Sequence, residues 1–213
     1  MSAIFGLFGC GLLTLVVVAT GLRLQRFPVS ARIAVMLAGA FAVFATFGDL
    51  SAAAYVRGVT GDLSMTTLVL AGAACVAQLN PRTVIEPRDL RALFWLVAAA
   101  AAFLYPFALG WTRFDPYALG YGSIEFVTAL LLVTLAAWHF RRNVVVLIVI
   151  AAALAYCAGA YESRNLWDYL IDPLVALYAL VRLLTGVRRR SREVAATKAC
   201  VASGDGSERG GSR

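Results

Sequence analysis

The sequence predicts an all-α integral membrane protein, a polytopic bundle of about seven transmembrane helices with the N-terminus outside and the C-terminus in the cytoplasm. Of its 213 residues, 61% are hydrophobic and only 15% are charged, and the mean hydropathy is +0.79. A soluble domain carries roughly 25% charged residues. This chain therefore has too little polar surface to cover a globule in water, and its apolar residues fall into long runs separated by arginines.

Seven apolar runs are candidates for crossing a bilayer, which takes about 20 largely apolar residues per helix. In chain order they cover residues 3–22, 31–48, 63–79, 90–110, 122–139, 143–161 and 166–184. The runs are continuous and do not alternate with a period of two, so they do not resemble the strands of an outer-membrane barrel. The first run has no basic residue before it and is followed by Arg23 and Arg26, which is the wrong arrangement for a signal peptide. We expect it to remain as an anchor.

The seventh run is the least regular, because it contains Asp168, Asp172 and Pro173. An acid followed by proline is typical of a helix N-cap and its first helical residue. This pattern starts a helix at Pro173. The preceding residues, 166–171, are then expected to form a turn or a kinked first segment.

Basic residues are concentrated in alternate connections, and this sets the orientation. The first, third and fifth connections and the tail hold Arg23, Arg26, Arg32, Arg82, Arg88, Arg91, Arg141, Arg142, Arg188, Arg189, Arg190 and Arg192. The second, fourth and sixth connections hold one arginine each, Arg57, Arg113 and Arg164. Because positive loops stay in the cytoplasm, seven spans fit this alternation, whereas six would leave Arg164 or the tail on the wrong side.

The domain organisation follows from the same pattern. Residues 1–187 form one seven-helix membrane domain, and residues 188–213 form a tail that is first basic and then rich in serine and glycine. Such a tail is predicted to be disordered and cytoplasmic. The arginine- and alanine-rich composition fits the bacterial inner membrane, with the lipid bilayer as the first partner.

Several function classes find no support in the sequence. The net charge of +7 is explained by topology and anionic lipid rather than by nucleic acid, and no RNA-binding motif or zinc-ligand spacing occurs. The only histidine is His139, and the only lysine, Lys198, lies in the tail, so a retinal Schiff base in the last helix is excluded. No phosphate loop or hydrolase motif is present. We expect no metal and no cofactor.

The three connections expected outside each combine one arginine with carboxylates, and aromatic residues lie close by. The sequence therefore predicts an outward-facing binding surface. Its expected residues are Asp49, Arg57, Asp62, Arg113, Asp115, Glu162, Arg164, Asp168, Asp172, Trp111, Tyr117 and Trp167.

A simpler explanation is that some of these acids only cap helices. Asp62, Glu125 and Asp172 fall near expected helix starts, where an anion suits the free N–H groups and the dipole. Asp49 lies at a helix end, and Asp168 would share a helix face with Asp172 and repel it. For Asp49 and Asp168 the alternatives are an arginine that bridges the loops or plain solvation.

Three functions remain open, and the balance favours a protein without catalytic activity. The first is a non-catalytic inner-membrane protein, an accessory or scaffold subunit of cell-envelope machinery that binds a protein partner. The second is a small transporter or flippase-like protein for a lipid-linked or polar substrate, although the middles of the runs carry no charge. The third is an intramembrane enzyme for a lipid-linked substrate, with two of the acids as an acid/base pair.

Overall fold

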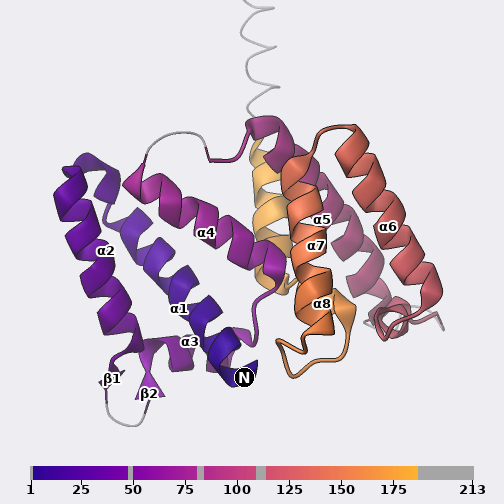
Figure 1. The fold of residues 1–213 in the computed structure, drawn as a ribbon, viewed down its shortest axis with the longest axis horizontal. Coiled ribbons are helices and arrows are strands. Elements are labelled where there is room, and N and C mark those ends of the chain that lie inside the picture. The colour runs from indigo at the N-terminus through magenta and orange to yellow at the C-terminus, as the bar shows by residue number, and fades with distance from the viewer. Residues whose placement is uncertain (1, 48–49, 81–83, 109–113, 187–213) are drawn as a thin grey trace, which may run out of the picture.

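The described part of the chain is helical apart from one small hairpin. The computed structural model describes residues 2–47, 50–80, 84–108 and 114–186. The long helices are α1 (Ser2–Gly21), α2 (Val29–Phe44), α4 (Met65–Leu79), α5 (Pro87–Ala108), α6 (Ile124–His139), α7 (Asn143–Cys157) and an unlabelled C-terminal helix (Pro173–Gly186), which is yellow in Figure 1. Each overlaps one of the seven predicted apolar runs, so the all-α prediction is confirmed.

Among the described residues, four short helical segments and two strands connect the long helices. The short helices are η1 (Leu24–Arg26), α3 (Ala52–Thr60), η2 (Pro116–Gly120) and α8 (Leu166–Leu170). Strands β1 (Thr46–Phe47) and β2 (Leu50–Ser51) pair antiparallel just before α3. Helix α3 was not predicted, because it lies in the connection that was expected to be a loop.

Two of the described helices are long and apolar enough to span a membrane, over Ile4–Gly21 and Pro87–Phe107. The other five long helices have between 10 and 17 residues in their apolar segments, fewer than the about 20 residues that a straight span needs. By length and composition alone, two such helices are weak evidence for membrane association, because a buried core helix or a signal sequence meets the same test.

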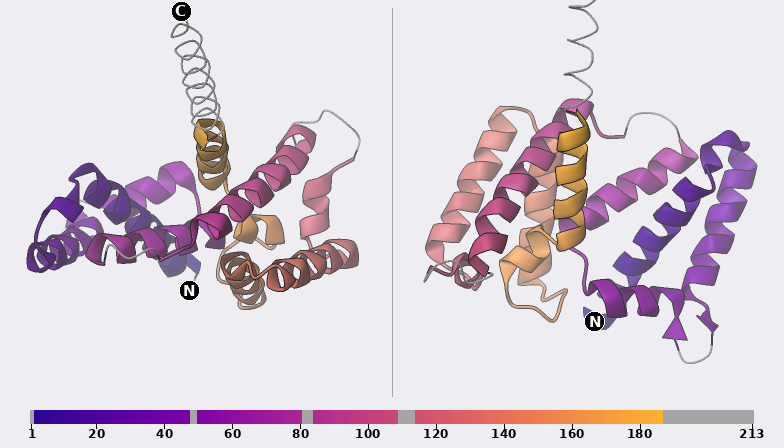
Figure 2. Two further views of the ribbon diagram at one scale, coloured as in Figure 1. Left: turned by 90° about the horizontal axis from the view of Figure 1, so that it is seen from above. Right: turned by 180° about the vertical axis from the view of Figure 1, so that it is seen from behind.

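The long helices form two groups, as Figure 1 shows. Helix α1 packs against α2, α3 and α4, while α7 packs against α5 and α6. Helix α4 joins the groups, because it also contacts α7 and α8. The view from behind in Figure 2 shows α3 lying across the lower ends of α1 and α2, which are the start of α1 and the end of α2. We call the end of the bundle that carries α3, η2 and α8 the acidic end.

Helix starts at the acidic end are defined by short polar side chains. The Oγ atom of Ser64 accepts the N–H of Thr67 at the start of α4, at 3.3 Å. Ser123 Oγ likewise accepts the Phe126 N–H at the start of α6, at 3.2 Å. The prediction that Asp62 and Glu125 cap these helices is therefore wrong, because in each case a serine two residues away makes the cap. Glu125 nevertheless lies in the first turn of α6, where its charge suits the helix dipole.

The seventh run is divided as the sequence predicted. Helix α8 ends at Leu170, Ile171 is extended with φ −143° and ψ 140°, and the next helix begins at Pro173. Asp172 caps that helix by accepting the Val175 N–H at 2.8 Å. Because the chain is extended between α8 and Pro173, Asp168 and Asp172 do not share one helix face, and the repulsion expected between them does not arise.

Candidate functional site

The centre of the acidic end is the carboxylate of Asp172, which is only 5% exposed. Its Oδ2 atom accepts hydrogen bonds from the Ser64 N–H at 2.9 Å, from Ser64 Oγ at 2.8 Å and from Thr67 Oγ1 at 2.5 Å. Its Oδ1 atom accepts the Val175 N–H. One carboxylate thus joins the first turns of α4 and the C-terminal helix, which are 108 positions apart in the sequence. Four donors and two helix N-termini offset the cost of burying this negative charge.

A second set of hydrogen bonds joins the segment after α7 to Leu63 and to the first turn of α4. The hydroxyl of Tyr161 donates to the Leu63 carbonyl at 2.5 Å, and Thr66 Oγ1 donates to the Leu170 carbonyl. Tyr169 is fully buried, and its hydroxyl accepts the Tyr161 N–H at 3.1 Å. Because buried polar groups must find partners, these bonds hold the segment in one arrangement.

Asp168 is bound by hydroxyl groups. Its Oδ2 atom accepts hydrogen bonds from the Tyr117 hydroxyl at 2.9 Å and from Ser163 Oγ at 2.5 Å. Burial, and secondly donation to Asp168, raise the pKa of Tyr117 above its ordinary value, so this tyrosine stays protonated and acts as a donor. Among the described residues, Asp168 is therefore held by uncharged donors, and an arginine bridge from Arg113 lies outside the described residues.

Helix η2 docks on α8 through Asn165 and Trp167. Asn165 Oδ1 accepts the Trp167 N–H at 3.0 Å and caps α8, and its Nδ2 donates to the Tyr117 carbonyl at 2.8 Å. The indole Nε1 of Trp167 donates to the Pro116 carbonyl at 3.0 Å. Gly120 permits this docking, because a Cβ atom there would lie 1.8 Å from Asn165 Oδ1.

Arg57 of α3 forms two ion pairs at the acidic end. Its Nε donates to Asp62 Oδ1 at 2.7 Å, and its Nη2 lies 3.7 Å from Glu162 Oε1. The hydrogen bond to Asp62 raises the pKa of Arg57. The pair packs on α1 at Gly6, where a Cβ atom would lie 1.9 Å from Asp62 Oδ1. Since the Arg57 side chain is 24% exposed, each pair contributes about 1 kcal/mol or less.

The predicted surface residues thus separate into groups. Arg57, Asp62 and Glu162 meet beside α1, while Tyr117, Trp167 and Asp168 meet where η2 contacts α8, and Asp172 lies inside between α4 and the C-terminal helix. Asp115 caps η2 by accepting the Tyr117 N–H at 2.9 Å, and Arg164 is exposed. Asp49, Trp111 and Arg113 lie outside the described residues.

The sequence did not point to the uncharged residues whose hydrogen bonds build the acidic end. These are Leu63, Ser64, Thr66, Thr67, Tyr161, Ser163, Asn165 and Tyr169. Two of them carried a local signal, since Ser64 and Asn165 each stand immediately before a run of helix-forming residues, which is the usual place of an N-cap.

The two carboxylates at the middle of the acidic end, Asp168 and Asp172, take part in structural hydrogen bonds. Both central carboxylates, Asp168 and Asp172, already accept two or more hydrogen bonds from protein donors. Within the described part of the chain, no group of three or more His, Cys, Asp or Glu residues gathers where it could hold a metal ion.

Comparison of the chain with protein-family models, with curated proteins and with solved structures found no match. The function is therefore argued from the geometry of this chain alone.

Proposed function

We propose that this chain is a seven-span protein of the bacterial inner membrane, with its acidic end outside and its tail in the cytoplasm. Support comes from large apolar side chains on the outside of the helices. Those between 61% and 79% exposed include Ile4, Leu37, Phe41, Leu132, Trp138, Leu154 and Leu177. Soluble monomers rarely expose contiguous apolar patches larger than a few hundred Å². The shorter helices fit a bilayer that thins locally around them.

The role that the geometry favours is non-catalytic, as an accessory or scaffold subunit of cell-envelope machinery. The observation that carries this proposal is that protein donors already occupy the carboxylates of Asp168 and Asp172. A general acid or base must reach the proton it transfers on a substrate, but Asp172 is buried and Asp168 is held by two hydroxyls. This weakens the case for an enzyme with these acids as its acid/base pair.

Helix α3 is the element best placed to meet a protein partner. It lies across the acidic end and exposes Tyr55 and Val59, the latter 88% exposed, one helical turn apart. The exposed Glu162 and Arg164 belong to the same end of the bundle. Aromatic and apolar side chains bordered by charges are typical of protein interfaces, so we assign the partner to this surface.

The test is to isolate the protein from its native membrane in lipid-preserving particles and to identify what accompanies it by mass spectrometry. We expect a stoichiometric envelope protein that is lost in Val59→Asp, because a carboxylate at the interface must be desolvated. Val84→Asp, at the opposite end of the bundle, is the matched control and should keep the partner. A lipid-linked sugar without any protein would contradict the scaffold role and favour transport or an enzyme.

A further inference from the structure

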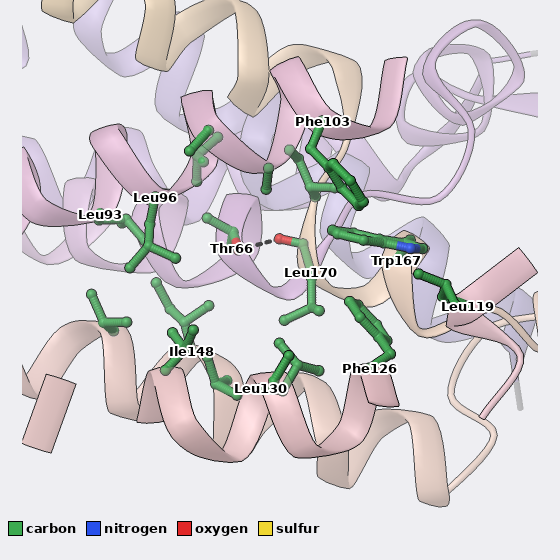
Figure 3. Close-up of a pocket in the computed structure, with 18 of the residues that line it drawn as sticks. Thr66, Leu93, Leu96, Phe103, Leu119, Phe126, Leu130, Ile148, Trp167 and Leu170 are labelled. Atoms are coloured by element: carbon green, nitrogen blue, oxygen red, sulfur yellow. Dashed lines mark hydrogen bonds between the residues drawn. The ribbon is translucent and has the colours of Figure 1, made fainter. Parts of the chain in front are cut away.

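A cavity of about 400 Å³ lies between α5, α6 and α7, beside α8. Its volume is within the range of about 300–1,000 Å³ that is usual for small-molecule sites. Figure 3 shows Leu93, Leu96 and Phe103 of α5 on one side of it, and Phe126 and Leu130 of α6 on the other. Helices α5 and α6 each pack on α7, and the cavity occupies the space between them.

The wall offers almost no hydrogen-bonding group to a ligand. Thr66 donates its hydroxyl hydrogen to the Leu170 carbonyl, a bond drawn in Figure 3, and Trp167 donates its indole N–H to Pro116. Most of the remaining lining is aliphatic or aromatic. Apolar cavities of this kind stay dry, so the occupant must itself be apolar.

The shape of the cavity favours a chain over a compact ring system. Along α5 the lining extends from Leu93 to Phe103, which at 1.5 Å per residue is about 15 Å parallel to the helix axis. Ala99 of α5 and Ala129 of α6 line the cavity and are themselves exposed. The cavity is therefore reached from the side of the bundle that faces lipid in the proposed placement.

The acidic end of the cavity suits a lipid headgroup. Among the described residues of the lining, Glu125 is the only ionisable one, and it lies exposed in the first turn of α6. A carboxylate at this position accepts hydrogen bonds from an ammonium or hydroxyl group and repels an uncompensated anion. The aromatic rings of Phe126 and Trp167, 4.4 Å apart, close this end of the cavity.

We propose that this cavity binds one acyl chain of an outer-leaflet phospholipid, which enters from the side between α5 and α6 and keeps its ammonium-bearing headgroup near Glu125. The inference rests on the membrane placement proposed above, but not on the protein partner.

The test uses the full chain in nanodiscs that contain phosphatidylethanolamine with a photoreactive diazirine halfway along one acyl chain. After illumination, peptides are mapped by mass spectrometry. Labelling should concentrate on α5 and α6, several-fold above α2, which exposes Phe41 and Leu37 to the same bilayer. Even labelling of all helices would overturn the proposal, because it would mean that only bulk lipid contacts the protein.

Two matched variants separate the cavity from the rest of α5. Ala99→Trp places an indole in the cavity and should remove most of the α5 and α6 labelling, whereas Ala102→Trp, one turn away and outside the lining, should keep it. If Ala99→Trp does not fold, Ala129→Trp from α6 tests the same space. Equal labelling in the cavity-filling and control variants would overturn the proposal.

The two proposals fail in distinguishable ways. A chain that is extracted from membranes by alkaline carbonate and does not enter nanodiscs would overturn both the membrane placement and the lipid site. A chain that inserts but shows even labelling loses only the lipid site.

Discussion

Asp172→Ala is expected to lower the free energy of unfolding by about 3–5 kcal/mol, because buried donors left without a partner cost about 1–3 kcal/mol each. The hydroxyls of Ser64 and Thr67 lie 3.4 Å apart and can turn toward each other. The N–H groups of Ser64 and Val175 have no such freedom, since Ser64 is the N-cap residue of α4 and Val175 lies in the first turn of the C-terminal helix. The loss therefore falls on the junction between α4 and the C-terminal helix.

The matched control is Asp115→Ala, which removes the same functional group from another helix cap. Asp115 is exposed and accepts one N–H, that of Tyr117, so its loss should cost only about 1 kcal/mol. Both variants are measured by denaturant unfolding in mixed micelles, followed by circular dichroism. If the two substitutions proved equally mild, Asp172 would not be the centre of the acidic end.

Gly120→Ala is the second substitution with a large expected effect. The added Cβ would lie 1.8 Å from Asn165 Oδ1 and 2.7 Å from Trp167 Cδ1. Both side chains are buried, so Asn165 must move and give up its bonds to the Trp167 N–H and the Tyr117 carbonyl. Overpacking together with two lost hydrogen bonds is expected to cost about 2–4 kcal/mol.

Gly72→Ala provides the control for this glycine. Gly72 lies inside α4, and a Cβ there meets nothing within 4 Å. Alanine is favoured over glycine in a helix interior by about 0.5–1 kcal/mol, so this variant should be slightly more stable than the parent protein in the same unfolding experiment. A Gly120→Ala protein as stable as the parent would show that η2 does not dock closely on α8.

The hydrogen bonds around Asp172 and Tyr169 make the acidic end the best-connected part of the described chain. Buried, fully satisfied polar networks of this kind hold a single arrangement. They connect α4, α8 and the C-terminal helix, which belong to separate stretches of the sequence. A rigid end of the helix bundle suits the proposed scaffold role.

The sequence located the long helices because apolar runs of this length leave few alternatives to a helix in an apolar environment. It did not indicate α3, because a nine-residue segment that contains Arg57 and Gly58 is too short and too polar to be distinguished from a loop. It correctly divided the seventh run at Asp172, because an N-cap followed by proline is a local signal that does not depend on tertiary contacts.

The partners of the acids were less predictable. Arg57 and Asp62 are close in the chain, so their pairing belonged to the predicted cluster. Asp172, in contrast, is bound by Ser64 and Thr67 from a distant helix, and no local pattern relates these residues. The sequence prediction considered only arginines as bridging partners of the acids. Hydroxyl and amide donors, however, satisfy a buried carboxylate without adding a second buried charge.

The central claim is the seven-span topology with the acidic end outside, and cysteine accessibility tests it most directly. In a parent with its four cysteines replaced by alanine, single cysteines are introduced at Val59, Glu162, Arg88 and Arg141 and treated with a membrane-impermeant maleimide in right-side-out vesicles. We predict that the cysteines at 59 and 162 react at once and that those at 88 and 141 react only after permeabilisation. Immediate labelling at 88 or 141, or protection at 59 or 162, would contradict this topology.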